Sequence, residues 1–257
     1  MTDKEFTLTN QELAQLDTIS KNSLYSCGVM TPAIQYCFRI LKRYLRGRRI
    51  LELGPAEGVM TELLSQTGME LTVVEGSSVF CESLRLRFPA VKVVHALFEQ
   101  FEPDEKYDVI VLGHVLEHVQ DPRSVLLLAR SWLQPNGIIF AAVPNARSLH
   151  RQAAVVMDLL PQEDALNDKD RHHGHRIVFN PESFRAAFIR VGFVIDVFGG
   201  YWLKPVSNSQ IENTWTPSMV EAFMQLGERY PDIAGEIYVV ASNNFKKSYE
   251  NRLDQNH

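Results

Sequence analysis

The sequence is poor in cysteine and contains no long apolar run. Its three cysteines, Cys27, Cys37 and Cys81, show neither CxxC spacing nor histidines at zinc-ligand spacing, which favours reduced thiols over a disulfide, metal or catalytic role. No stretch approaches the roughly 18 consecutive apolar residues that a membrane span needs. The first residues are polar and acidic where a secretory signal would be basic and then apolar. We therefore expect a soluble cytoplasmic protein with no membrane partner.

The chain also lacks an excess of positive charge. It carries 26 lysines and arginines against 31 aspartates and glutamates, a formal net charge of −5 at pH 7. Such a balance gives no general attraction to polyanions, and the basic run RGRR at 46–49 is too short to provide one. We expect a small-molecule partner and no nucleic acid, and a homodimer is compatible with the sequence.

What is present is a regular alternation of β-rich and amphipathic segments. Predicted strands cover 49–53, 71–75, 91–95, 107–113, 137–143, 193–198 and 236–242. Predicted helices cover 59–66, 78–88, 121–133, 148–160, 181–193 and 217–230. Several of these strands are apolar on successive residues, as expected of parallel strands covered by helices on both faces. The pattern favours an α/β fold with a doubly wound, mostly parallel seven-stranded sheet.

The remaining segments flank or interrupt this core. Two further helices are predicted at 10–20 and 32–46, the second with Thr31 as its cap and Pro32 in its first turn. The polar stretch 161–175 has no regular period and is predicted to be a loop. The expected organisation is an N-terminal helical lid or flank over 1–47, a main domain over 48–242 with cap-forming insertions at about 145–178 and 200–232, and a polar tail over 243–257.

A glycine-containing turn lies between the first strand and the helix that follows it. Glu52, Gly54 and Gly58 form an ExGxxxG pattern, which lets a ligand approach the backbone at a helix N-terminus. Glu75 ends the next strand about 20 residues on, where a carboxylate can accept both ribose hydroxyls of an adenosine. The pair predicts a nucleoside-containing cofactor.

These motifs, together with YDVIVLGHVLEHVQDP at 107–122 and LQPNGIIFAAVPN at 133–145, resemble the class I S-adenosylmethionine-dependent methyltransferases. The resemblance runs from about 48 to 199 and includes the last strand. LEHV followed by DP is similar to the small-molecule branch that contains the ubiquinone-biosynthesis O-methyltransferases. Two positions depart from the family pattern: Ala56 replaces the usual middle glycine, and Ala96 stands where an acid often binds the adenine.

The resemblance implies a Rossmann-like methyltransferase fold and S-adenosylmethionine as cofactor, with S-adenosylhomocysteine as product. Residues of four turns after the first four strands are then expected to bind the cofactor. They are Glu52, Gly54, Pro55, Ala56, Gly58, Glu75, Gly76, Ser77, Ala96, Leu97, Phe98, Gly113 and His114.

Histidines gather where the methyl acceptor is expected, beyond the carboxyl ends of strands four and five. Transfer to a hydroxyl requires alignment of the nucleophile and removal of its proton, which a neutral histidine can perform at pH 7. His114 is the first candidate for the base, His175 the second and His173 the third. The side chains expected to bind the acceptor are His172, Arg176, Tyr201 and Lys204. The basic ones favour an anionic acceptor, and Tyr201 offers a wall for a sugar or planar ring.

Other interpretations are weighed beside this one. The leading hypothesis is O-methylation of a sugar, a nucleotide-sugar or a phosphorylated metabolite without a metal, whereas His114, Glu117 and His118 are the alternative set for a divalent metal. A non-catalytic, cofactor-binding partner subunit is the alternative function. A nicotinamide oxidoreductase is disfavoured by the ExGxxxG spacing, and a nucleic-acid methyltransferase by the charge balance and the missing base-flipping signature.

Overall fold

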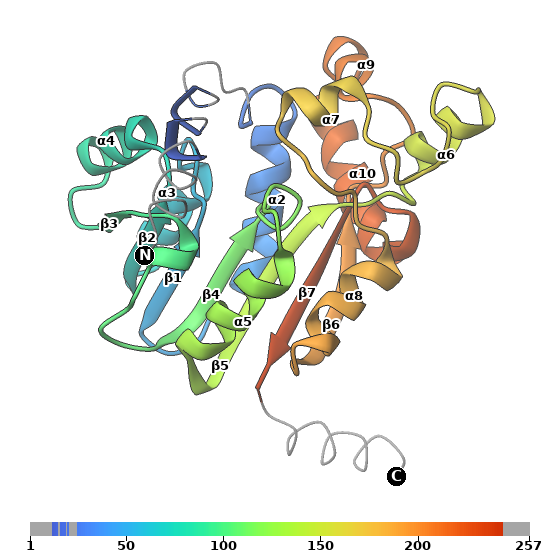
Figure 1. Ribbon diagram of the computed structural model, residues 1–257. Helices are drawn as coiled ribbons and strands as arrows, with labels where there is room; N and C mark the ends of the chain where they lie inside the picture. The colour runs from blue at the N-terminus through green and yellow to red at the C-terminus, as the bar shows by residue number, and fades with distance from the viewer. Residues whose placement is uncertain (1–11, 15, 19, 21–24, 244–257) are drawn as a thin grey trace.

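In the computed structural model, described over residues 12–14, 16–18, 20 and 25–243, seven strands form one sheet in the order β3-β2-β1-β4-β5-β7-β6 (Figure 1). Strands β1 to β5 run parallel, and β7 runs antiparallel to both β5 and β6. The strands are β1 (Arg49–Leu53), β2 (Glu70–Glu75), β3 (Lys92–His95), β4 (Tyr107–Gly113), β5 (Leu133–Pro144), β6 (Val194–Tyr201) and β7 (Glu236–Ser242). The predicted mostly parallel α/β sheet is confirmed.

Helices cover both faces of the sheet because its strands carry apolar side chains on both sides. In β1, Leu51 and Leu53 pack with α5 (Pro122–Trp132) and α8 (Pro181–Arg190). Ile50 packs on the opposite face with α2 (Met30–Lys42), α3 (Val59–Ser65) and α10 (Pro217–Arg229). Helix α4 (Ser78–Arg87) lies beside β2 and β3, toward one edge of the sheet (Figure 1).

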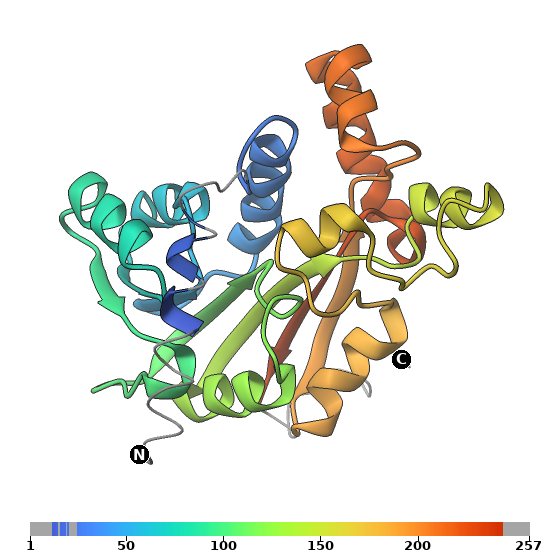
Figure 2. The ribbon, with the colours of Figure 1, turned by 45° about the horizontal axis from the view of Figure 1, so that its top comes forward.

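Three short helices lie beyond the edge at which the parallel strands end (Figures 1 and 2). They are α6 (Leu149–Val156), α7 (Asp168–His172) and α9 (Asn208–Thr214). The prediction of an irregular loop over 161–175 is wrong at α7, because Asn167 and Asp170 form a reciprocal capping box that stabilises one helical turn. Two 3₁₀ turns, η1 (Phe98–Gln100) and η2 (Pro231–Ile233), complete the described elements.

Some predicted boundaries also need correction. Helix α2 begins at Met30 instead of residue 32, and no side chain caps it, because the Thr31 hydroxyl donates to the Ser26 carbonyl. It ends at Lys42, four residues earlier than predicted. Strand β5 begins four residues earlier than predicted, at Leu133, and β6 extends three residues further, to Tyr201.

The two ends of the chain are only partly described. Residues 12–14, 16–18 and 20 are helical, in agreement with the helix predicted over 10–20. The predicted polar tail lies outside the described residues except for Asn243, and the division of the chain at 47 and 242 stays a prediction. Within the described ranges, none of the helices combines the length and apolarity that crossing a bilayer demands.

Candidate active site

A cavity of about 1010 Å³ opens at the carboxyl ends of the parallel strands. Residues of the turn after β1 and the end of β2 line one part of it, and the segments after β4, in α6 and α7, and after β6 line another. Of the residues predicted to bind cofactor, Glu52, Gly54, Pro55, Ala56, Glu75, Gly76, Ser77, Ala96, Leu97, Phe98, Gly113 and His114 all line this cavity. Gly58 does not line it.

The turn between β1 and α3 has a left-handed backbone at three positions. Gly54, Ala56 and Gly58 have φ angles of 63°, 46° and 77°. A left-handed conformation costs a residue with a Cβ about 1–2 kcal/mol, so Ala56 is strained where the family commonly has glycine. Gly58 is required for space as well, because an added Cβ would come within 2.6 Å of the Leu84 side chain. Its role is to start α3 close to its neighbours.

Glu75 is buried at the end of β2, facing this turn. Its Oε2 accepts a hydrogen bond from the Ala56 N–H at 3.2 Å, and its Oε1 accepts one from the Ser77 N–H at 2.8 Å. Burial raises the pKa of Glu75, and the hydrogen bonds from the backbone oppose the rise. A carboxylate has about four acceptor sites, so each oxygen retains one for a ribose hydroxyl.

Glu52 is a second buried carboxyl beside the turn. The Thr61 hydroxyl of α3 donates to its Oε2 at 2.6 Å. Burial raises the pKa of Glu52 to about 8, against the effect of this hydrogen bond, and the charge of Glu75 adds to the rise. Glu52 therefore holds a proton over much of the neutral range.

The end of the cavity expected to bind adenine is mostly apolar. Ala96, Leu97 and Phe98 line it as predicted, and sequence reasoning missed Phe80 of α4 and Glu99 of η1. Glu99 supplies a carboxylate three residues after Ala96, the position at which the family often has an acid. Motif comparison missed Glu99 because it lies at a different position.

The described N-terminal residues close this end. Leu16 lies against Gly76, and Asp17 accepts hydrogen bonds from the Ser77 hydroxyl at 2.9 Å and the Ser78 N–H at 2.7 Å.

His114 follows β4 with an unusual φ of 59°. Its Nδ1 is 3.3 Å from Oε1 of Glu117, and its Nε2 is 3.8 Å from Oε2 of Glu236 and 3.4 Å from the Tyr201 hydroxyl. Burial lowers the pKa of His114, but Glu236 and Glu117 outweigh it and raise the pKa to about 9. The imidazole is therefore cationic at pH 7, held between two buried carboxylates.

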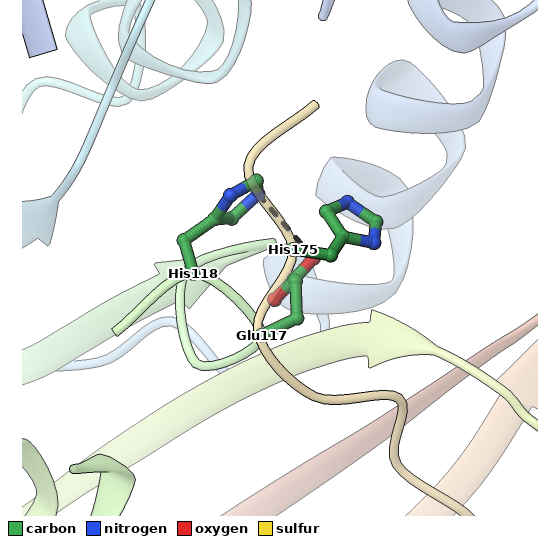
Figure 3. Close-up of side chains that lie close together, drawn as sticks. All are labelled: Glu117, His118 and His175. Carbon is green, nitrogen blue, oxygen red and sulfur yellow. Dashed lines mark ion pairs between the residues drawn. The ribbon is translucent and has the colours of Figure 1, made fainter. Parts of the chain in front are cut away.

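Glu117, His118 and His175 form a cluster beside His114, and Figure 3 shows these three side chains close together. Their ligand atoms lie within 4.8 Å of one another, and the His118 and His175 rings meet edge to face at 4.7 Å. Burial lowers the pKa of His118 to about 4 and also lowers that of His175, so both rings are neutral at pH 7. Neutral imidazoles and a carboxylate are donors for a divalent transition metal, which would draw them to roughly 3.4 Å apart. This set contains His175 where the sequence suggested His114.

The predicted histidine segment approaches the turn after β4 through its backbone. The Arg176 N–H donates to the Glu117 carbonyl at 2.7 Å, and the Tyr25 hydroxyl donates to the His173 carbonyl at 2.7 Å. His173, His175 and Arg176 line the cavity, as does Tyr25. His172 is exposed and lies outside the lining, so its predicted contact with an acceptor finds no support in the geometry.

The two remaining acceptor candidates differ in position. Lys204 lines the cavity, with its ammonium 4.9 Å from the centre of the Trp202 ring. Tyr201 has no exposed surface and no place in the lining, so it contacts His114 from behind and not an acceptor.

Glu236 and His150 are the main residues that sequence reasoning missed at this end. Glu236 begins β7 and pairs in register with Pro144 and Tyr201. Because β7 is antiparallel, its first residue reaches the edge at which the parallel strands end, and that reversal was the available signal. His150, in α6, gave no signal in a segment that was predicted only as a helix.

Comparison with known proteins agrees with this architecture. The sequence profile of the methyltransferase domain family matches residues 31–196. A ubiquinone biosynthesis O-methyltransferase from Pasteurella multocida is 30% identical over 128 residues, 44% of this chain and 52% of that protein. Its namesake from Paramagnetospirillum magneticum is 26% identical over 178 residues, 66% of this chain and 68% of that protein. A SAM-dependent methyltransferase structure from Archaeoglobus fulgidus matches with a TM-score of 0.55 at 19% identity, covering 82% of this chain and 93% of that one.

The strand order, the glycine turn and the strand-end carboxylate define the fold of class I S-adenosylmethionine-dependent methyltransferases. Because the family profile covers more than half of the sequence, this chain belongs to the methyltransferase domain family, whose cofactor is S-adenosylmethionine. The predicted fold, family and cofactor are confirmed. The match spans about half the length of the first curated relative.

Proposed function

We propose that this protein transfers the methyl group of S-adenosylmethionine to a hydroxyl oxygen of a small polar or anionic metabolite, such as a sugar, a nucleotide-sugar or a phosphorylated compound. The supporting observation is that one cavity is lined both by the buried Glu75 and by His114 with its neighbours Glu117, His118 and His175. Glu75 binds the ribose, the turn at 54–58 leaves room for the amino-acid tail, and Gly113 borders the reacting end. When bound, the cofactor supplies an electrophilic methyl carbon on its sulfonium.

The acceptor hydroxyl must lose its proton to a group beside His114. His114 is already protonated at pH 7, so it cannot accept a further proton. Its role is to orient the carboxylates of Glu117 and Glu236. Oε2 of Glu236 is buried without a hydrogen-bond partner among the described residues and lines the same cavity. Burial also raises the pKa of Glu236, which makes its carboxylate a stronger base than an exposed glutamate. We therefore assign proton removal to the Glu236 carboxylate, with the protonated His114 as a positioning residue in place of its predicted role as the base, and with His175 and His173 as the second and third candidates.

Replacement of Glu236 or His114 tests this assignment. We expect His114→Ala and Glu236→Gln to lower turnover well over tenfold while S-adenosylhomocysteine affinity stays nearly unchanged. The measurement is S-adenosylhomocysteine formation with a panel of phosphorylated, carboxylated and neutral hydroxyl compounds. Glu221→Gln, an exposed change on α10, is the control and should keep full turnover.

The pH profile adds a second readout. Turnover should fall as the pH drops through the raised pKa of Glu236, at a higher pH than the value of about 4.3 for an ordinary glutamate. That acid limb should vanish in Glu236→Gln. Full turnover in His114→Ala would remove His114 from the mechanism. A wild-type protein that binds the product but methylates no compound of the panel would favour the non-catalytic partner subunit.

A further inference from the structure

One corner of the cavity carries positive charge that the catalytic proposal does not use. Lys204 follows β6, Lys169 belongs to α7, and His150 belongs to α6, and all three line the cavity. The His150 N–H donates to the Lys204 carbonyl at 3.1 Å, which ties two of these segments together. The start of α6 and the segment after β6 are therefore held together before any ligand binds.

The Lys204 ammonium lies 4.9 Å from the centre of the Trp202 ring and has no hydrogen bond or ion pair with any residue in the described part of the chain. Its stem packs beside Gly235, where an added Cβ would come within 3.2 Å of the Lys204 Cβ. Burial lowers the pKa of Lys204 to about 8, with the carboxylate of Glu236 opposing the change. Lys204 is only partly buried, and the carboxylates of Glu236 and Asp170 act on its ammonium without contacting it.

His150 adds a second unpaired group to the corner. Its Nδ1 is buried and has no hydrogen-bond partner among the described residues. Burial lowers the pKa of His150 to about 2, and the charges of Lys204, Arg151 and Lys169 add to the shift. The ring is neutral, and its unpaired nitrogen can donate one hydrogen bond to a ligand.

The neighbouring charges do not satisfy this corner. Arg151 donates to the carbonyls of Glu163 and Ala165 and pairs with Asp170 at 3.1 Å, so each of its three guanidinium nitrogens already has a protein partner. Asp170 is also 3.7 Å from His175, and Glu236 is 3.8 Å from His114. Two ammonium groups and one imidazole nitrogen remain free for a ligand.

We propose that Lys204, Lys169 and His150 bind a phosphate group of the methyl acceptor, an inference that rests on the proposed function. Two lysines supply charge without fixed geometry, which suits a tetrahedral dianion. The guanidinium of Arg151 is held by protein groups, which leaves the two ammonium groups to bind a phosphate as point charges. The acceptor is therefore a phosphorylated compound whose hydroxyl lies at His114 and Glu236.

Amine labelling with inorganic phosphate as the probe tests the subsite without any methyl transfer. Trace acetylation near pH 8, read by peptide mass spectrometry, reports the free amine of each lysine. Phosphate should slow labelling of Lys204 and Lys169 by at least about threefold, because occupied sites are withheld from the reagent. Exposed Lys106, outside the cavity lining, is the internal control and should not change.

Two variants separate binding from folding. Lys204→Met keeps an apolar stem, and Lys169→Met changes an exposed residue of α7. Each should weaken phosphate binding by about tenfold in calorimetry, the size of one charge-assisted hydrogen bond, with S-adenosylhomocysteine affinity unchanged. Equal protection by acetate or by chloride at matched ionic strength would overturn the phosphate assignment, as would unchanged phosphate affinity in both variants. A wild-type protein that does not bind S-adenosylhomocysteine would instead count against the proposed function.

Discussion

Buried carboxyl groups set the character of this site residue by residue. Glu52, Glu75, Glu117 and Glu236 are all buried at the carboxyl edge of the sheet, and each meets different partners. Backbone N–H groups hold Glu75, and His114 together with neighbouring histidines lowers the pKa of Glu117 against the effect of burial. Burial raises the pKa of Glu52, with the charge of Glu75 adding to the rise and the hydrogen bond from Thr61 opposing it. The same side chain therefore serves as ligand, counter-ion or neutral acid according to its contacts.

The raised pKa of Glu52 links stability to pH. Its folded-state pKa of about 8 exceeds the ordinary value, so its contribution to the free energy of unfolding is present below about pH 4.5 and is lost as the pH rises through 8. Glu52→Gln cannot ionise and keeps an acceptor for Thr61. We expect the melting temperature of Glu52→Gln, relative to that of the wild type, to be higher at pH 8 than at pH 5. The change should be about 2–4 °C for each kcal/mol of stability that the wild type loses.

Thermal melts of the cofactor-free proteins at both pH values check this expectation. Glu62→Gln, a change at an exposed position of α3, is the control and should give a constant difference. A constant difference for Glu52→Gln as well would contradict the assigned pKa shift.

At the scale of elements, capping decides which polar segments fold into helices. Asn180 precedes α8, where its side chain accepts from the Ser183 N–H at 2.8 Å while the Ser183 hydroxyl accepts from the Asn180 N–H at 3.0 Å. Helix α8 in turn supplies Phe184 and Phe188 to the hydrophobic core that it shares with the sheet and α5. Its N-terminal cap therefore has an effect on the whole domain.

Loss of this cap should be measurable. Asn180→Ala should lower the free energy of unfolding by about 1 kcal/mol, because the Ser183 N–H loses its side-chain acceptor. Urea denaturation followed by circular dichroism measures this free energy. The control is Glu82→Ala, at an exposed position of α4, which should stay within about 0.5 kcal/mol of the wild type. An Asn180→Ala protein as stable as the control would show that the cap is dispensable.

The elements also show what a sequence can reveal. Strands such as β1 and β4 were predicted from consecutive apolar residues, because burial on both faces leaves that pattern. Helix α8 was predicted from Pro181 at its start and Gly192, with a φ of 86°, at its end. Helix α7 was missed because a capping box stabilises a single polar turn without any hydrophobic period.

At the scale of the whole molecule, the sheet order brings distant segments to one edge. Residues from the first strand turn to the start of β7 line a single cavity. The cofactor part was predictable because its residues follow consecutive strands at fixed spacing. The acceptor part was only partly predictable, because Glu236 depends on the antiparallel direction of β7 and Tyr201 on packing behind His114.

The net charge of the molecule gives no guide to the acceptor. The chain has a net charge of −5, yet Lys204 and Lys169 face the cavity without ion-pair partners among the described residues. Overall charge governs long-range attraction, whereas the position of each ammonium governs what binds in a cavity. A phosphorylated acceptor is therefore compatible with an acidic protein.

The proposed function depends on Glu75 and the turn at 54–58 binding the nucleoside of the cofactor. Titration calorimetry of S-adenosylhomocysteine into the wild type and into Glu75→Ala measures this binding. We expect one site per chain in the wild type and an affinity at least about tenfold weaker in the variant, since two ribose hydrogen bonds to a charged group are lost. No binding to the wild type, or equal affinity in a folded variant, would contradict it.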